Sequence, residues 1–370
     1  MTLRNASKGL ADDLPDDLSG GGLSQQLFNG ELGFIADRLS IRPARREPAL
    51  TLNQLRTFLA VAETGSVRAA AEQLVVTQAA VSASLAAMQR ALGIQLIRPD
   101  GRGLRLTSAG QEYAGYAHRV LGLLDEAHLA AVAAADPERG ELRIAAVTTA
   151  AEQIVPGLLS GYRRQHPHTG VLLEAGNRDR VRALLEHHRV DLALAGRPEP
   201  GWDVRVHAVR PHELVVVSAP ELAAEAAAAG SGPAGAAGAT GLLRWLSGQA
   251  WLLREPGSGT RLSTEALLAE LDITPPTLTV GSNGAIRESA AVGLGVTLVS
   301  RDAVAQELAS GRLAEVRVPG TPLHRDWYLI AHPGRLPLPA ARLAAHVLGD
   351  SGKSGFHPPG PAAADPAAAV

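Results

Sequence analysis

Residues Thr51–Leu106 read TLNQLRTFLAVAETGSVRAAAEQLVVTQAAVSASLAAMQRALGIQLIRPDGRGLRL. Apolar residues in its first part recur three and four positions apart, which is the spacing that gathers them on one face of a helix. The spacing predicts a helix from about Asn53 to Glu63, ended by Gly65. Ser66 is then placed to cap a second helix over Val67–Leu74.

A third helix is predicted after a turn at Val75-Val76. Thr77 is placed to cap it, and Gly93 to stop it after Leu92. Its apolar residues face inward, which leaves an outer face for contacts with a partner. Three helices in this order predict a helix-turn-helix, in which the N-terminal residues of the last helix meet base edges in the major groove. The outward residues are Gln78, Ser82, Gln89 and Arg90.

A short basic hairpin is predicted next, with its turn at Gly101-Arg102-Gly103. Such a hairpin beside three helices predicts the wing of a winged helix-turn-helix that binds double-stranded DNA. Its arginines are expected to contact phosphate, and a merely solvated basic hairpin is the alternative. Arginines outnumber carboxylates six to three between residues 51 and 106, as expected for a DNA-binding module. The predicted DNA-binding residues are Thr77, Gln78, Ser82, Ser84, Arg98, Arg102 and Arg105.

The bulk composition bounds the other possibilities. A chain of 370 residues is long enough for two or three domains, and a net charge of -2 argues against a chain coated in nucleic acid. With no cysteine, disulfides and thiolate metal sites are excluded. No apolar run spans a membrane, and acidic residues occupy the place where a signal peptide needs basic ones, so we expect a soluble cytoplasmic protein with no membrane partner. Residues 1–49 are predicted to be a disordered extension, and a start codon placed too far upstream would look the same.

A long helix is predicted from Thr107, its N-cap, to about Ala134. Apolar residues recur along it at alternating spacings of four and three, which is a heptad seam. One such seam could be the buried stripe of a globular helix. Its length favours pairing with a second copy, so we predict a dimerisation helix over residues 108–135. The DNA-binding domain is then predicted to cover residues 50–107. The seam residues are Tyr113, Ala117, Val120, Leu124, Ala127 and Ala131.

From Glu141 onward, buried strands alternate with helices, which predicts an α/β fold with a mostly parallel sheet. Two such sets predict a two-lobed, periplasmic-binding-protein-like effector domain over residues 136–348, with a cleft between the lobes. The second set is expected to contain strands at Glu213–Ser218 and Asp326–Ala331. Gly230–Gly241 is predicted to be a mobile surface loop, and residues 349–370 a disordered tail.

Residues 51–348 resemble LysR-type transcriptional regulators. The resemblance rests on NQLRTFLAVAETGSVRAAAEQLVVTQAAVSASL, on LGIQLI and GRGLRLTSAG at the start of the long helix, and on the two-lobed domain. WLLREPGSGTR and GSNGAIRESAAVGLGVTLVS are similar to the subgroup that regulates Calvin-cycle operons, although regulators of sulfur and nitrogen metabolism carry similar loops. The resemblance implies a homotetramer of dimers paired through the long helix and bound to inverted repeats. It also implies that a metabolite in the cleft alters DNA bending and contact with RNA polymerase.

The sequence departs from the family pattern in its third helix. The family usually has an arginine after the serine of this helix, and here Ala83 follows Ser82. The usual acidic residue further along is replaced by Met88-Gln89. Base readout is therefore expected to rest on Gln78, Ser82 and the wing.

A Gly-rich segment, Gly257–Arg261, lies between a predicted strand and a helix. Free N–H groups at a helix start favour an anion, and arginine suits carboxylate or phosphate. Two further strand-to-helix junctions should converge on the same cleft. Each junction alone could be only a helix cap. The predicted effector-binding residues are Thr148, Thr149, Ser258, Gly259, Thr260, Arg261, Ser282 and Asn283.

Several other kinds of site are not supported by the sequence. The Gly-rich segment lacks the Gly-Lys-Ser/Thr of a phosphate-binding P-loop, and no cofactor is predicted. His166, His168, His187 and His188 do not match a metal-binding spacing and are interpreted as surface residues. No nucleophile and base are recognisable, so the chain is predicted not to be an enzyme. A two-lobed sensor without sequence-specific DNA binding is the alternative function. The ligand is left open: the resemblance suggests sugar phosphates, phosphoenolpyruvate or reduced nicotinamide cofactors.

Overall fold

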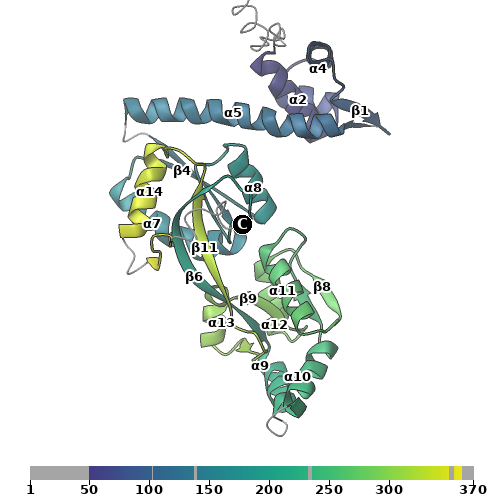
Figure 1. Ribbon diagram of the computed structural model, residues 1–370, viewed down its shortest axis with the longest axis vertical. Coiled ribbons are helices and arrows are strands. Elements are labelled where there is room, and N and C mark those ends of the chain that lie inside the picture. The colour runs from purple at the N-terminus through teal and green to yellow at the C-terminus, as the bar shows by residue number, and fades with distance from the viewer. Residues whose placement is uncertain (1–49, 102, 137–139, 232–235, 350–353, 361–370) are drawn as a thin grey trace, which may run out of the picture.

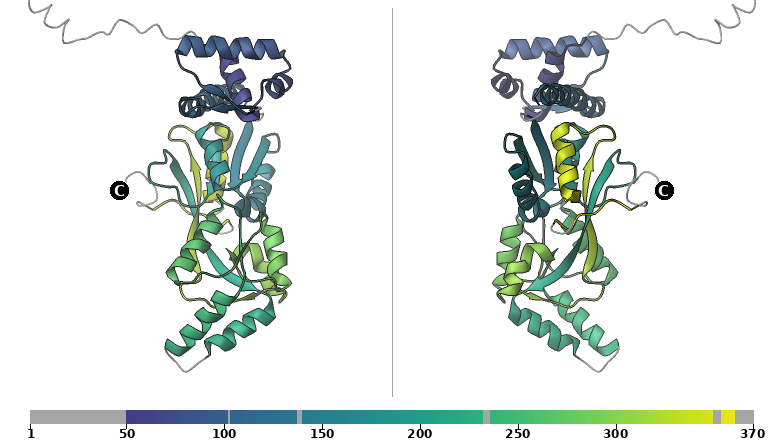
Figure 2. Two further views of the ribbon diagram at one scale, coloured as in Figure 1. Left: turned by 90° about the vertical axis from the view of Figure 1, so that its right-hand side faces the viewer. Right: turned by 90° about the vertical axis from the view of Figure 1, so that its left-hand side faces the viewer.

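The computed structural model describes residues 50–101, 103–136, 140–231, 236–349 and 354–360. The predictions for residues 1–49, for Arg102 and for the rest of the tail lie outside these ranges. Figures 1 and 2 show the DNA-binding module at one end of the molecule, one lobe of the effector domain in the middle and the other lobe at the far end.

The DNA-binding module has the predicted three helices and hairpin. The predicted caps are confirmed: the Ser66 side chain accepts the N–H of Ala69 at 3.4 Å, and the Thr77 side chain accepts that of Ala80 at 3.2 Å. Gly93 ends the third helix in the left-handed conformation, with φ of 67°. The elements are α2 (Leu52–Thr64), α3 (Val67–Leu74), α4 (Gln78–Leu92), β1 (Ile97–Asp100) and β2 (Gly103–Leu106).

The long helix α5 (Ser108–Ala135) begins at its predicted N-cap, Thr107, and lies across the effector domain (Figure 1). At about 1.5 Å per residue it spans roughly 40 Å. Its first turns belong to the module core, where the rings of Tyr113 and Phe58 meet edge to face at 5.7 Å and Ala117 is buried. Two residues of the predicted seam are therefore used inside the chain. The rest of the predicted seam, Val120, Leu124, Ala127 and Ala131, stays exposed, and together with Tyr116 and Leu123 it forms the exposed stripe of α5.

Lobe I is built on three parallel strands, β3 (Glu141–Val147), β4 (Gly170–Gly176) and β5 (Leu192–Ala195). β3 lies between the other two, and its apolar residues Leu142 and Ile144 are fully buried. The helices of this lobe are α6 (Thr148–Gln153), α7 (Val155–Gln165), α8 (Arg178–Glu186) and α14 (Leu338–Gly349).

Two long antiparallel strands, β6 (Arg205–Ser218) and β11 (Leu323–Ala331), run from lobe I into lobe II (Figure 1). β9 (Thr297–Ser300) and β10 (Ala314–Glu315) pair antiparallel with β6, and β11 pairs antiparallel with β5 and β6, so the prediction of a mostly parallel sheet is wrong for these strands. In lobe II, β7 (Trp251–Leu253) and β8 (Thr277–Thr279) do pair parallel. The predicted strand at Glu213–Ser218 is only the second half of β6. Lobe II adds α9 (Pro220–Gly230), α10 (Ala236–Gly248), β7 (Trp251–Leu253), α11 (Gly259–Glu270), β8 (Thr277–Thr279), α12 (Asn283–Ala291), β9 (Thr297–Ser300), a 3-10 turn (Arg301–Val304), α13 (Ala305–Ala309) and β10 (Ala314–Glu315).

Three further sequence predictions are wrong. Gly230 and residues 236–241 belong to α9 and α10, because α10 anchors itself in the core of lobe II through the buried Leu246. Residues 354–360 are ordered around Phe356, which is 1% exposed in the core of lobe I, and His357 forms a backbone bridge with Val209 of β6. His187 and His188 are half-buried between α5 and lobe I. None of the described helices is both long and apolar enough to cross a membrane.

Candidate effector site and DNA interface

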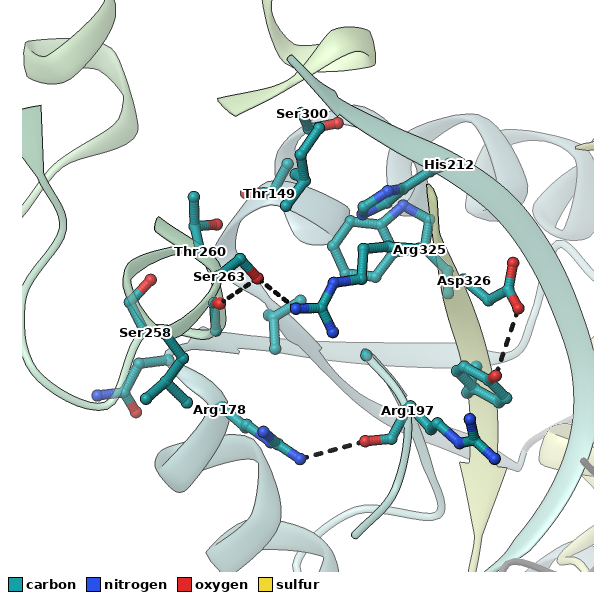
Figure 3. Close-up of a pocket in the computed structure, with 18 of the residues that line it drawn as sticks. Thr149, Arg178, Arg197, His212, Ser258, Thr260, Ser263, Ser300, Arg325 and Asp326 are labelled. Carbon is teal, nitrogen blue, oxygen red and sulfur yellow. Dashed lines mark hydrogen bonds between the residues drawn. The ribbon is translucent and has the colours of Figure 1, made fainter. Parts of the chain in front are cut away.

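A cavity of about 500 Å³ opens between the two lobes. Its walls come from the carboxyl ends of β3, β4, β5 and β9, from the start of α11 and from the middle of β6 and β11 (Figure 3). A cleft at the carboxyl ends of strands is where open α/β sheets bind ligands, and this volume suits a small metabolite.

One wall of the cavity is the first turn of α11. The first N–H groups of a helix have no acceptor within the helix, so they favour an anion. The Ser258 hydroxyl lines the cavity and makes no capping bond to the helix. Gly257 has φ of +84°, and a Cβ there would lie 2.7 Å from the Asp179 carboxylate of lobe I. Both the backbone conformation and the neighbouring side chains of lobe I therefore favour glycine at this position.

Arg325 of β11 places a positive charge inside the cavity (Figure 3). Its guanidinium donates to the Ser263 hydroxyl at 2.7 Å and forms no ion pair with any described carboxylate. Arg197, on the opposite wall, likewise has no ion pair among the described residues, whereas Arg178 is paired with Glu199 at 3.1 Å. The cavity thus holds two cations whose charge is available to an anion.

Three buried polar atoms in the cavity wall lack a hydrogen-bond partner among the described residues: His212 Nδ1, Ser300 Oγ and Trp327 Nε1. The His212 and Trp327 rings meet edge to face, with centroids 4.1 Å apart. Burial lowers the pKa of His212 to about 4, so its imidazole is neutral at neutral pH. Since buried polar groups are normally hydrogen-bonded, these three atoms give the cavity wall unused polar capacity, and the Trp327 N–H in particular calls for an acceptor.

Five of the predicted effector-binding residues line the cavity: Thr148, Thr149, Ser258, Gly259 and Thr260. The Thr148 hydroxyl donates to the carbonyl of Gly176 at 3.1 Å, so part of its capacity is used within lobe I. The strand-to-helix junctions at β3 and α11 do converge.

The other three predicted residues do not line this cavity. Arg261 lies on another side of α11, where it pairs with Glu265 at 2.7 Å and donates to the Arg254 carbonyl at 3.0 Å. Ser282 caps α12, and its hydroxyl accepts the N–H of Ala285 at 3.4 Å. Asn283 joins the lobes instead.

Asn283 forms a polar link between the lobes. Its amide donates to the Thr149 hydroxyl at 3.2 Å and to Glu152 at 3.3 Å, and it accepts a hydrogen bond from Arg254. Thr149 and Glu152 belong to lobe I, whereas Arg254 and Asn283 belong to lobe II. A ligand beside Thr149 would therefore act directly on a contact that holds the lobes together.

Sequence reasoning missed Arg197, His212, Ser300, Arg325 and Trp327. Ser300 ends a predicted strand, so the strand-end rule could have found it. The two residues on β11 and His212 on β6 carried no local signal, because they enter the cavity from strands that cross between lobes.

The predicted DNA-reading residues Thr77, Gln78 and Ser82 are exposed along α4, and Ser84 is half-buried. Arg98 and Arg105 are exposed on the hairpin. The arrangement is the one that places a recognition helix and a basic wing against duplex DNA.

Gln89 was predicted to face outward, and this is wrong. Its side-chain oxygen accepts the N–H groups of Leu96 at 2.8 Å and Ile97 at 3.2 Å. The side chain fastens the wing to the recognition helix and is not free to read a base.

Two protein families match this chain and together cover both of its domains. Residues 52–111 match the family "Bacterial regulatory helix-turn-helix protein, lysR family", and residues 135–352 match "LysR substrate binding domain". The chain belongs to the LysR family of transcriptional regulators, which are not enzymes. It thus combines a helix-turn-helix module with an effector-binding domain.

Several similar curated proteins are named as transcriptional regulators, and some of them as regulators of a RuBisCO operon. The regulator CfxR of Cupriavidus necator is 34% identical over 286 residues, spanning 77% of this chain and 86% of that protein. CbbR of Xanthobacter flavus is 32% identical, spanning 83% and 90% of the two chains. The "RuBisCO operon transcriptional regulator" of Acidithiobacillus ferrooxidans is also 32% identical, spanning 82% and 97%.

Solved structures share the fold. Full-length CbnR in complex with its target DNA has a TM-score of 0.55 at 22% identity, covering 80% of this chain and 99% of that chain. ArgP from Mycobacterium tuberculosis has a TM-score of 0.56 at 21% identity, covering 80% and 97%.

Proposed function

We propose that this regulator binds an operator as an oligomer and changes its DNA contacts when a small anionic metabolite occupies the cavity between the lobes. The observation that carries the proposal is Arg325, whose guanidinium has no ion pair with a described residue and faces the cavity. A cation kept from its surrounding carboxylates is suited to a carboxylate or phosphate from outside.

The chemistry of the cavity wall narrows the class of ligand that would fit. Arg325, Arg197 and the start of α11 favour an anionic group, and the unpaired atoms of His212, Ser300 and Trp327 favour hydroxyl or carbonyl groups beside it. A small phosphorylated or carboxylated metabolite meets both requirements. The likeness to regulators of RuBisCO operons makes sugar phosphates and phosphoenolpyruvate the first compounds to test.

The fold offers a route from the cavity to the DNA. The ligand would contact β11 and α11 and lie beside the link between Asn283 and Thr149, so its binding would change the angle between the lobes. Lobe I contacts α5 through His188, which lies 2.8 Å from the Glu126 carboxylate of α5. A change in lobe geometry would therefore reach the helix that carries the DNA-binding module.

We further propose that pairs of chains associate through the exposed stripe on α5 and that two pairs form a homotetramer. Isolated exposed apolar residues are ordinary, but Tyr116, Val120 and Leu123 lie on one face of a single helix. Paired copies would present two recognition helices to an inverted repeat in cytoplasmic DNA. Each copy would contact phosphates through Arg98 and Arg105 and, we infer, Arg102. Contact with RNA polymerase is then the route by which transcription changes.

Calorimetry on the full-length protein tests the effector site. We expect Arg325→Ala to weaken the binding of an active metabolite by roughly tenfold or more, since a hydrogen bond to a charged group contributes about 1.5–3 kcal/mol. Arg261→Ala is the matched control, because this arginine lies outside the cavity and pairs with Glu265. Equal losses in both variants, or none in Arg325→Ala, would remove the proposed anion site.

A further inference from the structure

The surface around the start of the recognition helix is unusually apolar. All residues from Val75 to Ala80 are exposed, and so are Ala83 and Ala86 further along α4. Between Gln78 and Gln89, α4 carries no lysine or arginine. Most of what this helix can show to a base edge is therefore methyl groups, with Gln78 and Ser82 among them.

Val75 is the residue that most needs an explanation. Its side chain is 89% exposed and its backbone is left-handed, with φ of 57° and ψ of 45°. A β-branched residue is strained in this conformation, which glycine adopts freely and asparagine adopts readily. The turn is closed by backbone bonds from the N–H groups of Val75 and Val76 to α3, and these bonds need no valine side chain. Within the part of the chain that the structure describes, the Val75 side chain is thus left almost entirely to solvent.

The position of Val75 limits what its side chain can meet. It stands two residues before Thr77, the cap of the helix that this family lays into the major groove. In that groove arginine and lysine read guanine, glutamine reads adenine, and apolar side chains contact the C5-methyl group of thymine. A surface of valine and alanine with one glutamine matches A·T pairs.

We propose that Val75, Ala79 and Ala83 form an apolar reading surface for thymine methyl groups, beside which Gln78 reads adenine. Ala79 and Ala83 lie four residues apart and share one face of α4. The inference rests on the proposed operator binding and adds which bases are read and by what chemistry. It also explains how the helix reads DNA with alanine in place of the family's arginine.

The test begins with selection of binding sites from random duplex DNA by the full-length protein. Each thymine of the selected half-site is then replaced by deoxyuridine, which removes only the methyl group. We expect about fourfold weaker binding for each contacted methyl. Val75→Gly keeps the turn and should lose the sensitivity at one position. Val292→Gly serves as the control, because it removes an exposed valine that lies in lobe II. This variant should keep the full sensitivity to deoxyuridine.

The outcomes separate the two ideas. If no sequence is selected, the proposed operator binding fails. If a sequence is selected but deoxyuridine is tolerated at every position, or if Val75→Gly keeps the wild-type pattern, the apolar reading surface is overturned while operator binding stands. Thermal unfolding of Val75→Gly at or above the wild-type temperature confirms that a changed pattern is not a folding defect.

Discussion

His118 of α5 stacks on His187 at the end of α8, with ring centroids 4.4 Å apart and planes 11° from parallel. A second pair, His188 and His332, stacks at 3.9 Å beside it. These rings fill the contact between the helix that carries the DNA-binding module and the lobe that carries the effector cavity. Burial of the first pair, His118 and His187, favours their uncharged imidazoles.

The first prediction concerns pH. Burial, and then His118, lower the pKa of His187 to about 4; Arg119 and Arg180 act in the same direction, against Glu186. Burial also lowers the pKa of His118, helped by Arg189 and opposed by Glu63. A histidine whose folded pKa is depressed contributes stability above its unfolded pKa of about 6.5, and loses it as pH falls through the folded value.

We therefore expect the unfolding temperature to fall between about pH 6.5 and pH 4, and His187→Gln to reduce the dependence. His212 titrates in the same window, so a residual slope should remain. His168→Gln, at an exposed position, should behave as wild type. Thermal scans at several pH values measure this. A His187→Gln profile that overlays the wild type would contradict the assignment.

The second prediction concerns the backbone of α5. A Cβ on Gly122 would lie 1.8 Å from the carbonyl oxygen of His187, so Gly122→Ala must push α5 away from lobe I. We expect a loss of about 1–3 kcal/mol, as for other overpacked contacts. Gly115→Ala on the same helix meets nothing within 4 Å and should be neutral or stabilising by up to about 1 kcal/mol. Urea unfolding of the two variants compares them directly.

The third prediction concerns the ion pair of Arg143 and Asp191, whose side chains are 7% and 2% exposed. Asp191 also accepts the backbone N–H of Arg143 at 2.9 Å. Asp191→Ala leaves a buried guanidinium without its carboxylate, which costs about 3–5 kcal/mol. Glu288→Ala breaks a solvent-exposed pair with Arg312 and should leave the stability almost unchanged. Comparable losses in denaturant unfolding would contradict this account.

The fourth prediction concerns the C-terminal segment. Phe356 is buried in the core of lobe I, so Phe356→Ala should destabilise the effector domain by about 3–5 kcal/mol. Pro358→Ala, two residues away and exposed, should leave the stability within about 0.5 kcal/mol of wild type. Calorimetric unfolding separates the two, and an unaffected Phe356→Ala would show that the segment is dispensable.

The fifth prediction concerns oligomerisation. Leu123→Asp places a charge in the exposed stripe of α5 and should shift the protein toward monomers in sedimentation experiments. Leu278→Asp changes a similarly exposed leucine on β8 and serves as the control. A Leu123→Asp protein that sediments as wild type would place the interface elsewhere.

The helices of the DNA-binding module were predictable because local signals define them. Ser66, Thr77 and Thr107 each accept a backbone N–H at a helix start, and Gly65 and Gly93 end helices in left-handed geometry. Such signals need only neighbouring residues. The burial of Phe356 has no local signal, since the residues around it read as a Pro/Gly tail and only the tertiary fold shows its place.

The candidate site was only half predictable for the same reason. The start of α11 was recognisable from Gly257 to Thr260, but the side of the helix that faces the cleft depends on its packing. The sequence therefore points to Arg261, whereas the unpaired cations of the cavity are Arg197 and Arg325. Arg325 stands 62 residues from its partner Ser263. A pairing over that distance is set by β11 returning antiparallel to β6.

That returning strand has a consequence for how the protein is made. The sheet of lobe I lacks β11 and the bridge to His357 until residues 323–357 have left the ribosome. The DNA-binding module precedes these residues in the chain and can fold before they are made, because domains generally fold in the order of synthesis. A translation product that stops early would thus contain a folded DNA-binding module without a complete effector domain.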